Sequence, residues 1–164
     1  MLYTQTMPIL DFLDLHVDTV SNVTAHSFIA KSQARYLKNQ KDNLSETSCI
    51  VLLGFSENYQ FVVQDEIQDF HWNNISCTLH PVALYHTKNG ELQCESICVI
   101  SDDMEHDTPF VYQVQAEVVK FLEKELPHIT EMEYFSDGCA AQYKNFKNIL
   151  NLCHHLADFG ITAR

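Results

Sequence analysis

Carboxylates that follow predicted strands are the side chains of this chain whose type and position best suit metal chemistry. Asp137 follows the predicted strand 132–135 and precedes Gly138, which lets a turn or a ligand approach closely. Two-metal phosphoryl transfer needs carboxylates from separate elements that converge on cations roughly 4 Å apart. Asp137 therefore suits one ligand of Mg²⁺ or Mn²⁺, and it suits equally well a cap for the helix expected after it.

Two other acidic positions are weaker candidates for the same site. Glu57 lies three residues after Gly54, and because side chains alternate along a strand, Glu57 is expected to point away from the face of residue 54. It is a weak substitute for a catalytic acid. Asp102 follows another predicted strand and is a weak metal ligand, with a solvated acidic turn as the competing interpretation.

Three residues suit contacts with nucleic acid. Lys144 and Lys147 lie at helical spacing just beyond Asp137, where they could contact a phosphate. Trp72, beside Phe70 and His71, could stack on a base. Solvated lysines and an aromatic cluster at the edge of a core are the competing interpretations.

The charge of the chain opposes nucleic-acid binding. Its net charge is −12, and residues 51–164 carry six basic and seventeen acidic side chains. Such a surface repels DNA unless a basic patch or a divalent metal intervenes. The imbalance instead favours a protein partner that binds an acidic surface.

Composition places the protein among soluble globular chains. Apolar residues make up 46% of the sequence and charged residues 20%. No segment approaches the roughly 20 apolar residues of a membrane span. The first 20 residues carry three Asp and no Lys or Arg, unlike a secretory signal. We therefore expect an intracellular protein, in nucleus or cytoplasm, without a membrane partner. The six cysteines include no Cys-x2-Cys pair, which indicates free thiols, with those in apolar runs buried.

The apolar pattern predicts three strands, then two helices separated by a strand, after an N-terminal helical arm. The run 49–53 is apolar at every position, which is typical of a central strand covered on both faces. Asn89-Gly90 predicts a hairpin turn. The predicted elements are strands at 49–53, 77–86 and 95–101, a helix after Asp107-Thr108-Pro109, a strand at 132–135 and a helix at 142–157 that buries Phe146, Ile149, Leu150, Cys153 and Leu156.

This order predicts an α/β fold with a mixed sheet flanked by helices. Residues 1–45 form the arm and a linker, with a polar connector from residue 38, and residues 46–164 form the α/β domain. Ligands of such sheets gather at the carboxyl ends of the strands. The ends at Gly54 and Asp137 are therefore expected to meet.

Three segments resemble a group of transposon-derived proteins that have the ribonuclease-H-like core of acidic-triad (DDE-type) transposases. The segments are 54–59, 64–72 and 136–145, and the run from Ser136-Asp137-Gly138 to Lys144-Asn145 is the most specific. The resemblance covers roughly 46–164. It implies an incomplete ribonuclease-H-like fold, metal-dependent cleavage and transfer of DNA strands, DNA as the partner, and Mg²⁺ or Mn²⁺ as the cofactor if any activity remains.

The resemblance also assigns the acidic positions. Gly54 occupies the position of the first acid, Asp137 that of the second, and the third is expected beyond Arg164, as in a chain truncated at its C-terminus. With Gly54 unable to bind a cation through a side chain, the resemblance implies a transposase-derived domain that is catalytically inactive, with Asp137 as the remnant of the site.

Two alternatives come from other functional classes. One is a domesticated interaction module that binds a protein through its acidic surface. The other is a ribonuclease-H-type exonuclease, which places Asp-x-Glu on the first strand. Gly54-Phe55-Ser56 does not supply that pair.

Overall fold

The computed structural model describes residues 4, 6–61 and 76–164, which form two compact units, Met1–Asp42 and Asn43–Arg164. The predicted aromatic contact at Trp72, and the run 64–72, lie outside the described residues. Each unit is described by itself below.

The first unit is one helix, α1, which spans Ile9–Asp42 and buries none of its residues. The helical arm is thus confirmed, but the helix continues through residues 38–42, which the sequence predicted as a connector. Lys38 Nζ lies 3.0 Å from Asp42 Oδ2, an i,i+4 ion pair that supports the last turn. An exposed pair of this kind contributes at most about 0.5 kcal/mol to the helix.

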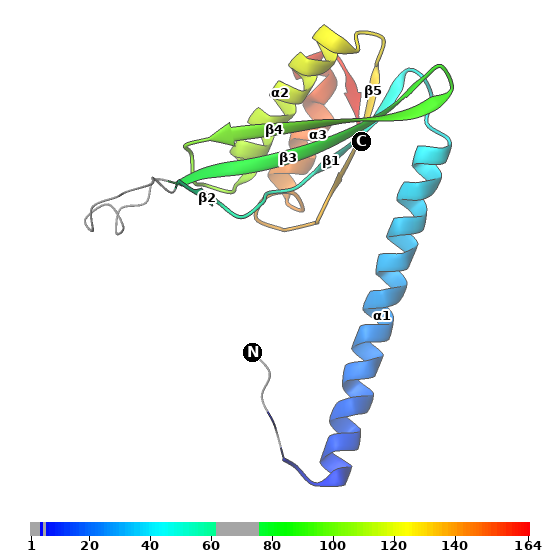
Figure 1. Ribbon diagram of the computed structural model, residues 1–164, viewed down its shortest axis with the longest axis vertical. Helices are drawn as coiled ribbons and strands as arrows, with labels where there is room; N and C mark the ends of the chain where they lie inside the picture. The colour runs from blue at the N-terminus through cyan, green and yellow to red at the C-terminus, as the bar shows by residue number, and fades with distance from the viewer. Residues whose placement is uncertain (1–3, 5, 62–75) are drawn as a thin grey trace, which may run out of the picture. The chain divides into compact units, whose positions relative to one another are not determined.

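The second unit is built on a six-stranded mixed sheet (Figure 1). The strands run in the order β2-β3-β1-β5-β6, and β4 pairs with β3. Strands β1 and β5 are parallel, whereas β3 is antiparallel to both β1 and β4. The strands are β1 Ser48–Leu53, β2 Tyr59–Gln60, β3 Ser76–Lys88, β4 Glu91–Ser101, β5 Glu131–Ser136 and β6 Thr162–Ala163.

The β3–β4 hairpin turns at the dipeptide that the sequence indicated. Asn89 and Gly90 have φ values of 56° and 78°, the two positive angles that a two-residue type I′ turn requires. Both strands are longer than their apolar runs predicted, because a tight turn lets pairing extend to Lys88 and Glu91.

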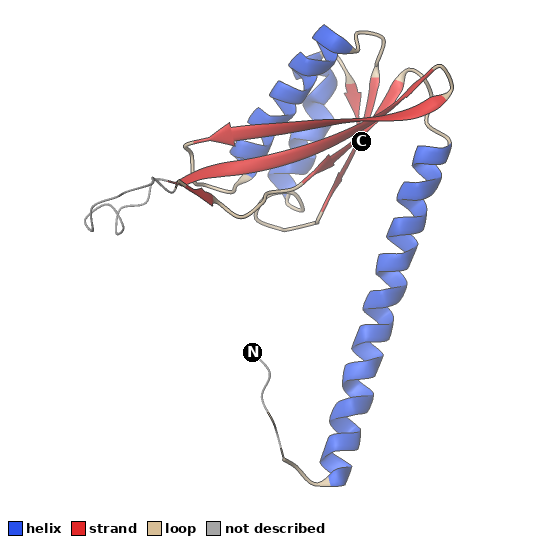
Figure 2. Ribbon diagram, viewed as in Figure 1, coloured by secondary structure: helices blue, strands red, loops and turns tan. Residues whose placement is uncertain are grey.

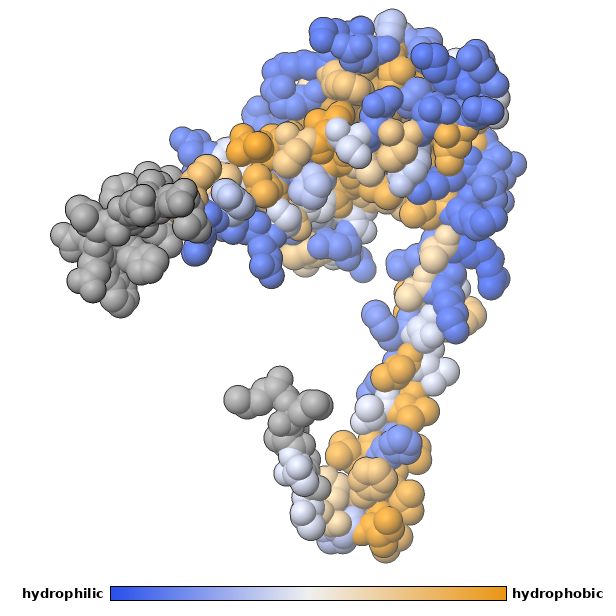
Figure 3. Space-filling view, in the orientation of Figure 1, coloured by the Kyte–Doolittle hydropathy of each residue, from blue (hydrophilic) through white to orange (hydrophobic). Residues whose placement is uncertain are grey.

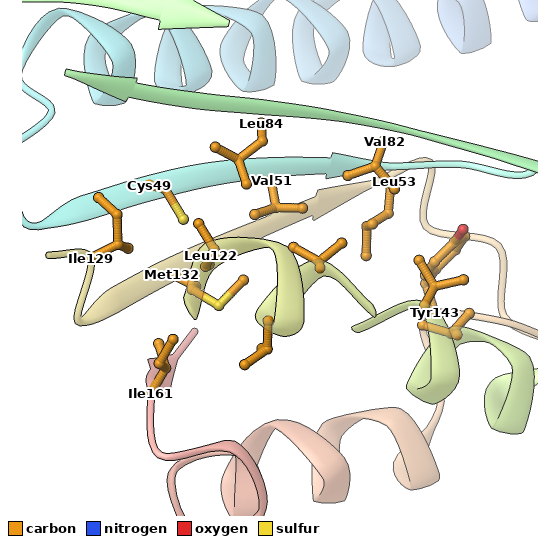
Figure 4. Packing of buried hydrophobic residues seen from close by; sticks show 14 of the residues in the cluster. Cys49, Val51, Leu53, Val82, Leu84, Leu122, Ile129, Met132, Tyr143 and Ile161 are labelled. Carbon is orange, nitrogen blue, oxygen red and sulfur yellow. The ribbon is translucent and has the colours of Figure 1, made fainter. Parts of the chain in front are cut away.

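Helices α2 (Thr108–Glu125) and α3 (Phe146–Phe159) lie on the same side of the sheet (Figure 2). Asp107 caps α2, since its carboxylate accepts a hydrogen bond from the Phe110 amide at 3.0 Å, as the sequence predicted. The buried face of α2 packs against β1, β3 and β5 (Figure 4). Ile50, on the other face of β1, is also fully buried, which confirms β1 as a central strand.

Helix α3 is oriented opposite to the prediction. It begins at Phe146, because Asn145 and not an earlier residue caps it. The apolar side chains expected inside are exposed, with Phe146 at 78% and Leu156 at 59%. The side that faces the domain instead carries the buried polar residues Asn148 and His155. The predicted burial of Phe146, Ile149, Leu150, Cys153 and Leu156 is therefore wrong.

Hydrogen bonds account for this orientation. His155 Nδ1 donates to the Ile161 carbonyl at 2.7 Å, which leaves Nε2 to accept from the Tyr134 hydroxyl at 3.0 Å. Asn148 donates to the Tyr143 carbonyl at 3.0 Å. These bonds tie α3 to β5 and to the chain before β6, and a hydrophobic pattern alone does not encode them.

The predicted class, α/β with a mixed sheet flanked by helices, is confirmed at that level. All six cysteines are free. Cys49 and Cys77 are buried as predicted, whereas Cys98 is exposed because it lies on the face of β4 away from the helices.

Candidate functional site

The carboxyl ends of β1 and β5 bring two of the predicted site positions together. Leu53 of β1 pairs with Ser136 of β5 in parallel register. Gly54 and Asp137 are the residues that directly follow this last pair. Residues paired across parallel strands project to the same face of a sheet. The expectation that these two ends meet is therefore confirmed.

Nothing in the backbone requires glycine at position 54. Its φ lies outside the positive range that favours glycine, and a Cβ added there would meet no atom within 4 Å. Pairing with β3 resumes just after it, where the Ser56 amide donates to the Leu79 carbonyl at 3.1 Å. A larger side chain thus fits at position 54 without disturbing the strand.

Asp137 is exposed and holds a turn. Its Oδ1 accepts a hydrogen bond from the Cys139 amide at 2.9 Å. The alternative that Asp137 caps the following helix is wrong, because Asn145 Oδ1 accepts from the Asn148 amide at 2.9 Å and fills that role. Among the described residues, none makes a hydrogen bond to the second carboxylate oxygen of Asp137.

A buried group of rings lies beside this edge, and sequence reasoning missed it. His80 of β3 is fully buried, and its Nε2 lies 2.8 Å from the Tyr143 hydroxyl. The Phe55 ring packs against His80 and against His106, at centroid distances of 4.6 and 4.2 Å. Strand alternation with Val82 and Leu84 was the available signal that His80 faces the helices.

Burial sets the protonation of these rings. Desolvation lowers the pKa of His80 to about 4, so its imidazole is neutral at pH 7. Burial, reinforced by the nearby Asp137 and Cys139, raises the pKa of Tyr143. The two rings therefore form a neutral hydrogen-bonded pair, a structural support for the edge that holds Asp137.

A second contact fastens the chain that follows Gly54. His106 Nε2 lies 2.9 Å from Asn58 Oδ1, and because that oxygen only accepts, the ring nitrogen carries the proton. Thr78 Oγ1 lies 3.4 Å from the same oxygen. The segment after β1 is thus tied to the loop that leads into α2.

The weaker acidic candidates are not brought to Asp137. Phe55 contacts Phe110 of α2, with ring centroids 5.1 Å apart, whereas Glu57 lies beyond the end of β1 and is exposed. Asp102 is exposed beyond the end of β4, which β3 and β1 separate from β5.

The two lysines lie near Asp137 in the chain and are exposed. The Lys144 amide donates to the Cys139 carbonyl at 3.0 Å, in the turn that follows Asp137. Lys147 lies in the first turn of α3. Their side chains are open to solvent, as contact with a phosphate would require.

The side chains present do not fit a two-metal centre. Within residues 6–61 and 76–164, no group of three or more His, Cys, Asp or Glu side chains gathers as a metal site would require. Gly54 offers no ligand atom beside Asp137.

Comparison with known proteins identifies one family. Residues 33–164 match a family described as a domain of unknown function (DUF8701). No curated protein and no solved structure matches the chain. In the part of the chain that is described, no helix has the length and apolar character to cross a bilayer.

Proposed function

This chain belongs to the DUF8701 family, and we propose that its residues 46–164 are a ribonuclease-H-like domain derived from a DDE-type transposase. The chemistry of that class is metal-dependent cleavage and transfer of DNA strands. In this chain the domain is catalytically inactive, because the position of the first acid is Gly54.

The order of the elements supports the proposal. Three antiparallel strands, β1, β3 and β4, precede α2, and β5, α3 and β6 follow. This order is similar to that of the ribonuclease-H-like core of the transposases that the chain resembles. Strand β1 lies at the centre, between β3 and β5.

One observation carries the proposal: Gly54 and Asp137 directly follow Leu53 and Ser136, the last pair in the parallel register of β1 and β5. Two carboxylates at these positions would lie on neighbouring strands about 4.8 Å apart, close enough to share divalent cations. The free space at Gly54 is what an aspartate at this position would need.

The same observation explains the loss of activity. A lone carboxylate in water binds divalent cations weakly, and Asp137 is exposed. Without a bound cation, the acidic surface of residues 51–164 repels a phosphate backbone.

Metal-dependent DNA binding by a restored variant tests the proposal. Gly54→Asp should bind a fluorescent DNA duplex more tightly with Mn²⁺ than with EDTA, because the cation bridges the carboxylates and a phosphate. The control, Gly54→Asn, adds a side chain of the same shape without the charge and should show no such gain. Equal responses of the two variants would contradict the proposed site.

A second candidate function, an interaction module for a protein partner, is favoured by the groove between β4 and α2. Strand β4 pairs only with β3 among the described strands, so its outer edge is open to strand addition. The groove beside it has a volume of about 610 Å³, with Ile97 and Val114 in its lining and Asp103 and Glu117 among its polar residues.

An extended segment with apolar and basic residues in alternation suits this groove. An alternating Val-Lys peptide should bind, and Glu117→Lys should weaken it about fivefold, the effect of one exposed ion pair. Glu123→Lys, an equal charge change elsewhere on the exposed surface of α2, is the control. Equal losses in both variants would exclude the groove as the binding surface.

A further inference from the structure

Helix α1 exposes apolar side chains along its whole length. It has 34 residues and buries none of them, although Ile9 is 70% exposed and Val23 is 60% exposed. Apolar surface gathers on its N-terminal half (Figure 3). In proteins, most helical stability comes from tertiary packing. A helix of this kind therefore needs a partner surface.

One line of side chains on α1 has the spacing of a coiled coil. Starting at Ile9, positions that alternate by four and three residues are apolar in seven of nine cases, and this seam continues to Leu37. A sustained period of 3.5 residues is the signature of helices that supercoil around one another. The α1 seam consists of Ile9, Leu13, His16, Val20, Val23, Ser27, Ala30, Ala34 and Leu37.

The charges of α1 are separated along its axis. Three acidic residues lie in its first ten positions, at Asp11, Asp14 and Asp18, and no basic residue precedes Lys31. The last twelve positions hold four basic side chains and a single acidic one, Asp42. Side-by-side helices in parallel would bring like charges together, whereas antiparallel helices bring opposite charges together.

We propose that α1 pairs with α1 of a second copy of this chain as an antiparallel coiled coil along the α1 seam. The charge pattern indicates that the partner is a second copy, because the acidic N-terminal half of one α1 complements the basic C-terminal half of the other. The opposed dipoles of two antiparallel helices also attract. The inference does not depend on the proposed function of residues 46–164.

The antiparallel register gives well-matched layers. Leu13 meets Leu37 of the second copy, and Val20 meets Ala30, so that in the second of these layers the larger side chain lies against a smaller one. In a parallel pair, Ala34 would meet Ala34 and Lys41 would meet Lys41. Packing and charge thus select the same orientation.

The mass of the full chain in solution tests the pairing. Light scattering during gel filtration should give a dimer, and Val20→Asp with Val23→Asp should raise the dissociation constant at least about 100-fold, because carboxylates would be buried in the seam. The control, Phe28→Asp with Ile29→Asp, makes the same change off the seam and should remain dimeric. A monomeric wild type, or equal losses in both double variants, would overturn the proposal.

Disulfide formation tests the orientation separately. Leu13→Cys and Leu37→Cys chains, mixed and oxidised with glutathione disulfide, should form a disulfide between positions 13 and 37, located by mass spectrometry. Each variant alone should not link to itself, because at 1.5 Å per residue the like positions lie about 36 Å apart in the antiparallel pair. A link between two copies of position 13 would overturn the antiparallel arrangement.

Discussion

Gly54 and Asp137 directly follow Leu53 and Ser136, which pair in register across the parallel strands β1 and β5. One position carries an exposed carboxylate, and the other carries no side chain although space for one is free. Of these two positions, only Asp137 thus offers a carboxylate. The buried pair of His80 and Tyr143 supports the same edge from the helix side.

His155 should contribute strongly to stability, unlike its neighbour His154. His155→Ala removes two hydrogen bonds, so that the Ile161 carbonyl loses its partner and the Tyr134 hydroxyl keeps the weaker contact with the Met132 sulfur at 3.7 Å. We expect a loss of about 2–4 kcal/mol in the free energy of unfolding. The exposed His154→Ala should change it by less than about 0.5 kcal/mol. Urea titrations measure both, and similar values for the two variants would be inconsistent with the position of α3.

Stability should fall as the pH falls below about 6.5. The folded pKa of His80 is lowered to about 4, so the native state favours the neutral ring, and protonation of the unfolded chain destabilises the fold at lower pH. The unfolding free energy should drop by about 2 kcal/mol between pH 7.5 and 5. The lowered pKa of His155 acts in the same direction.

The variant His80→Gln checks the origin of this pH dependence. It keeps a polar side chain in β3 but cannot titrate, so the decline between pH 7.5 and 5 should become shallower. An unchanged decline would show that His80 is not the group responsible.

Asp107, which caps α2, should contribute more to the free energy of unfolding than the exposed Asp102 of the same loop. Asp107→Ala removes the acceptor for the Phe110 amide and should cost about 1 kcal/mol. Asp102→Ala deletes an exposed carboxylate of the same loop and should be nearly neutral. Thermal unfolding by circular dichroism distinguishes the two, and an equal shift in Tm would argue against the cap.

Two leucine substitutions test the orientation of α3. Leu122→Ala, in the core, should cost about 2–5 kcal/mol, whereas Leu156→Ala, 59% exposed, should cost less than about 0.5 kcal/mol. If α3 buried its apolar face, the two costs would be comparable. Chemical unfolding of both variants supplies the comparison.

Most elements of the fold could be predicted because their signals are local. Asn89-Gly90 specifies a hairpin, Asp107 caps a helix, and the run 49–53 marks the central strand. The orientation of α3 could not be predicted, since it depends on hydrogen bonds from His155 to the Tyr134 hydroxyl in β5 and to the Ile161 carbonyl before β6. A pattern of apolar spacing contains no information about those partners.

The site was predictable only in part. That Gly54 and Asp137 lie at adjacent strand ends follows from the parallel arrangement of their strands. The rings of His80, His106 and Tyr143 come from three separate parts of the chain, and no spacing in the sequence links them. Their proximity is a property of the tertiary structure.

The central claim is that Gly54 and Asp137 are the remnant of a metal site. Its most direct test is the binding of Mn²⁺ to the Gly54→Asp variant, measured by electron paramagnetic resonance. The variant should bind Mn²⁺ more tightly than the wild type, and adding Asp137→Asn should reverse the gain by more than about tenfold, the cost of disturbing a metal ligand. If Gly54→Asp binds no more Mn²⁺ than the wild type, or if Asp137→Asn leaves its affinity unchanged, these two positions do not form the remnant of a metal site.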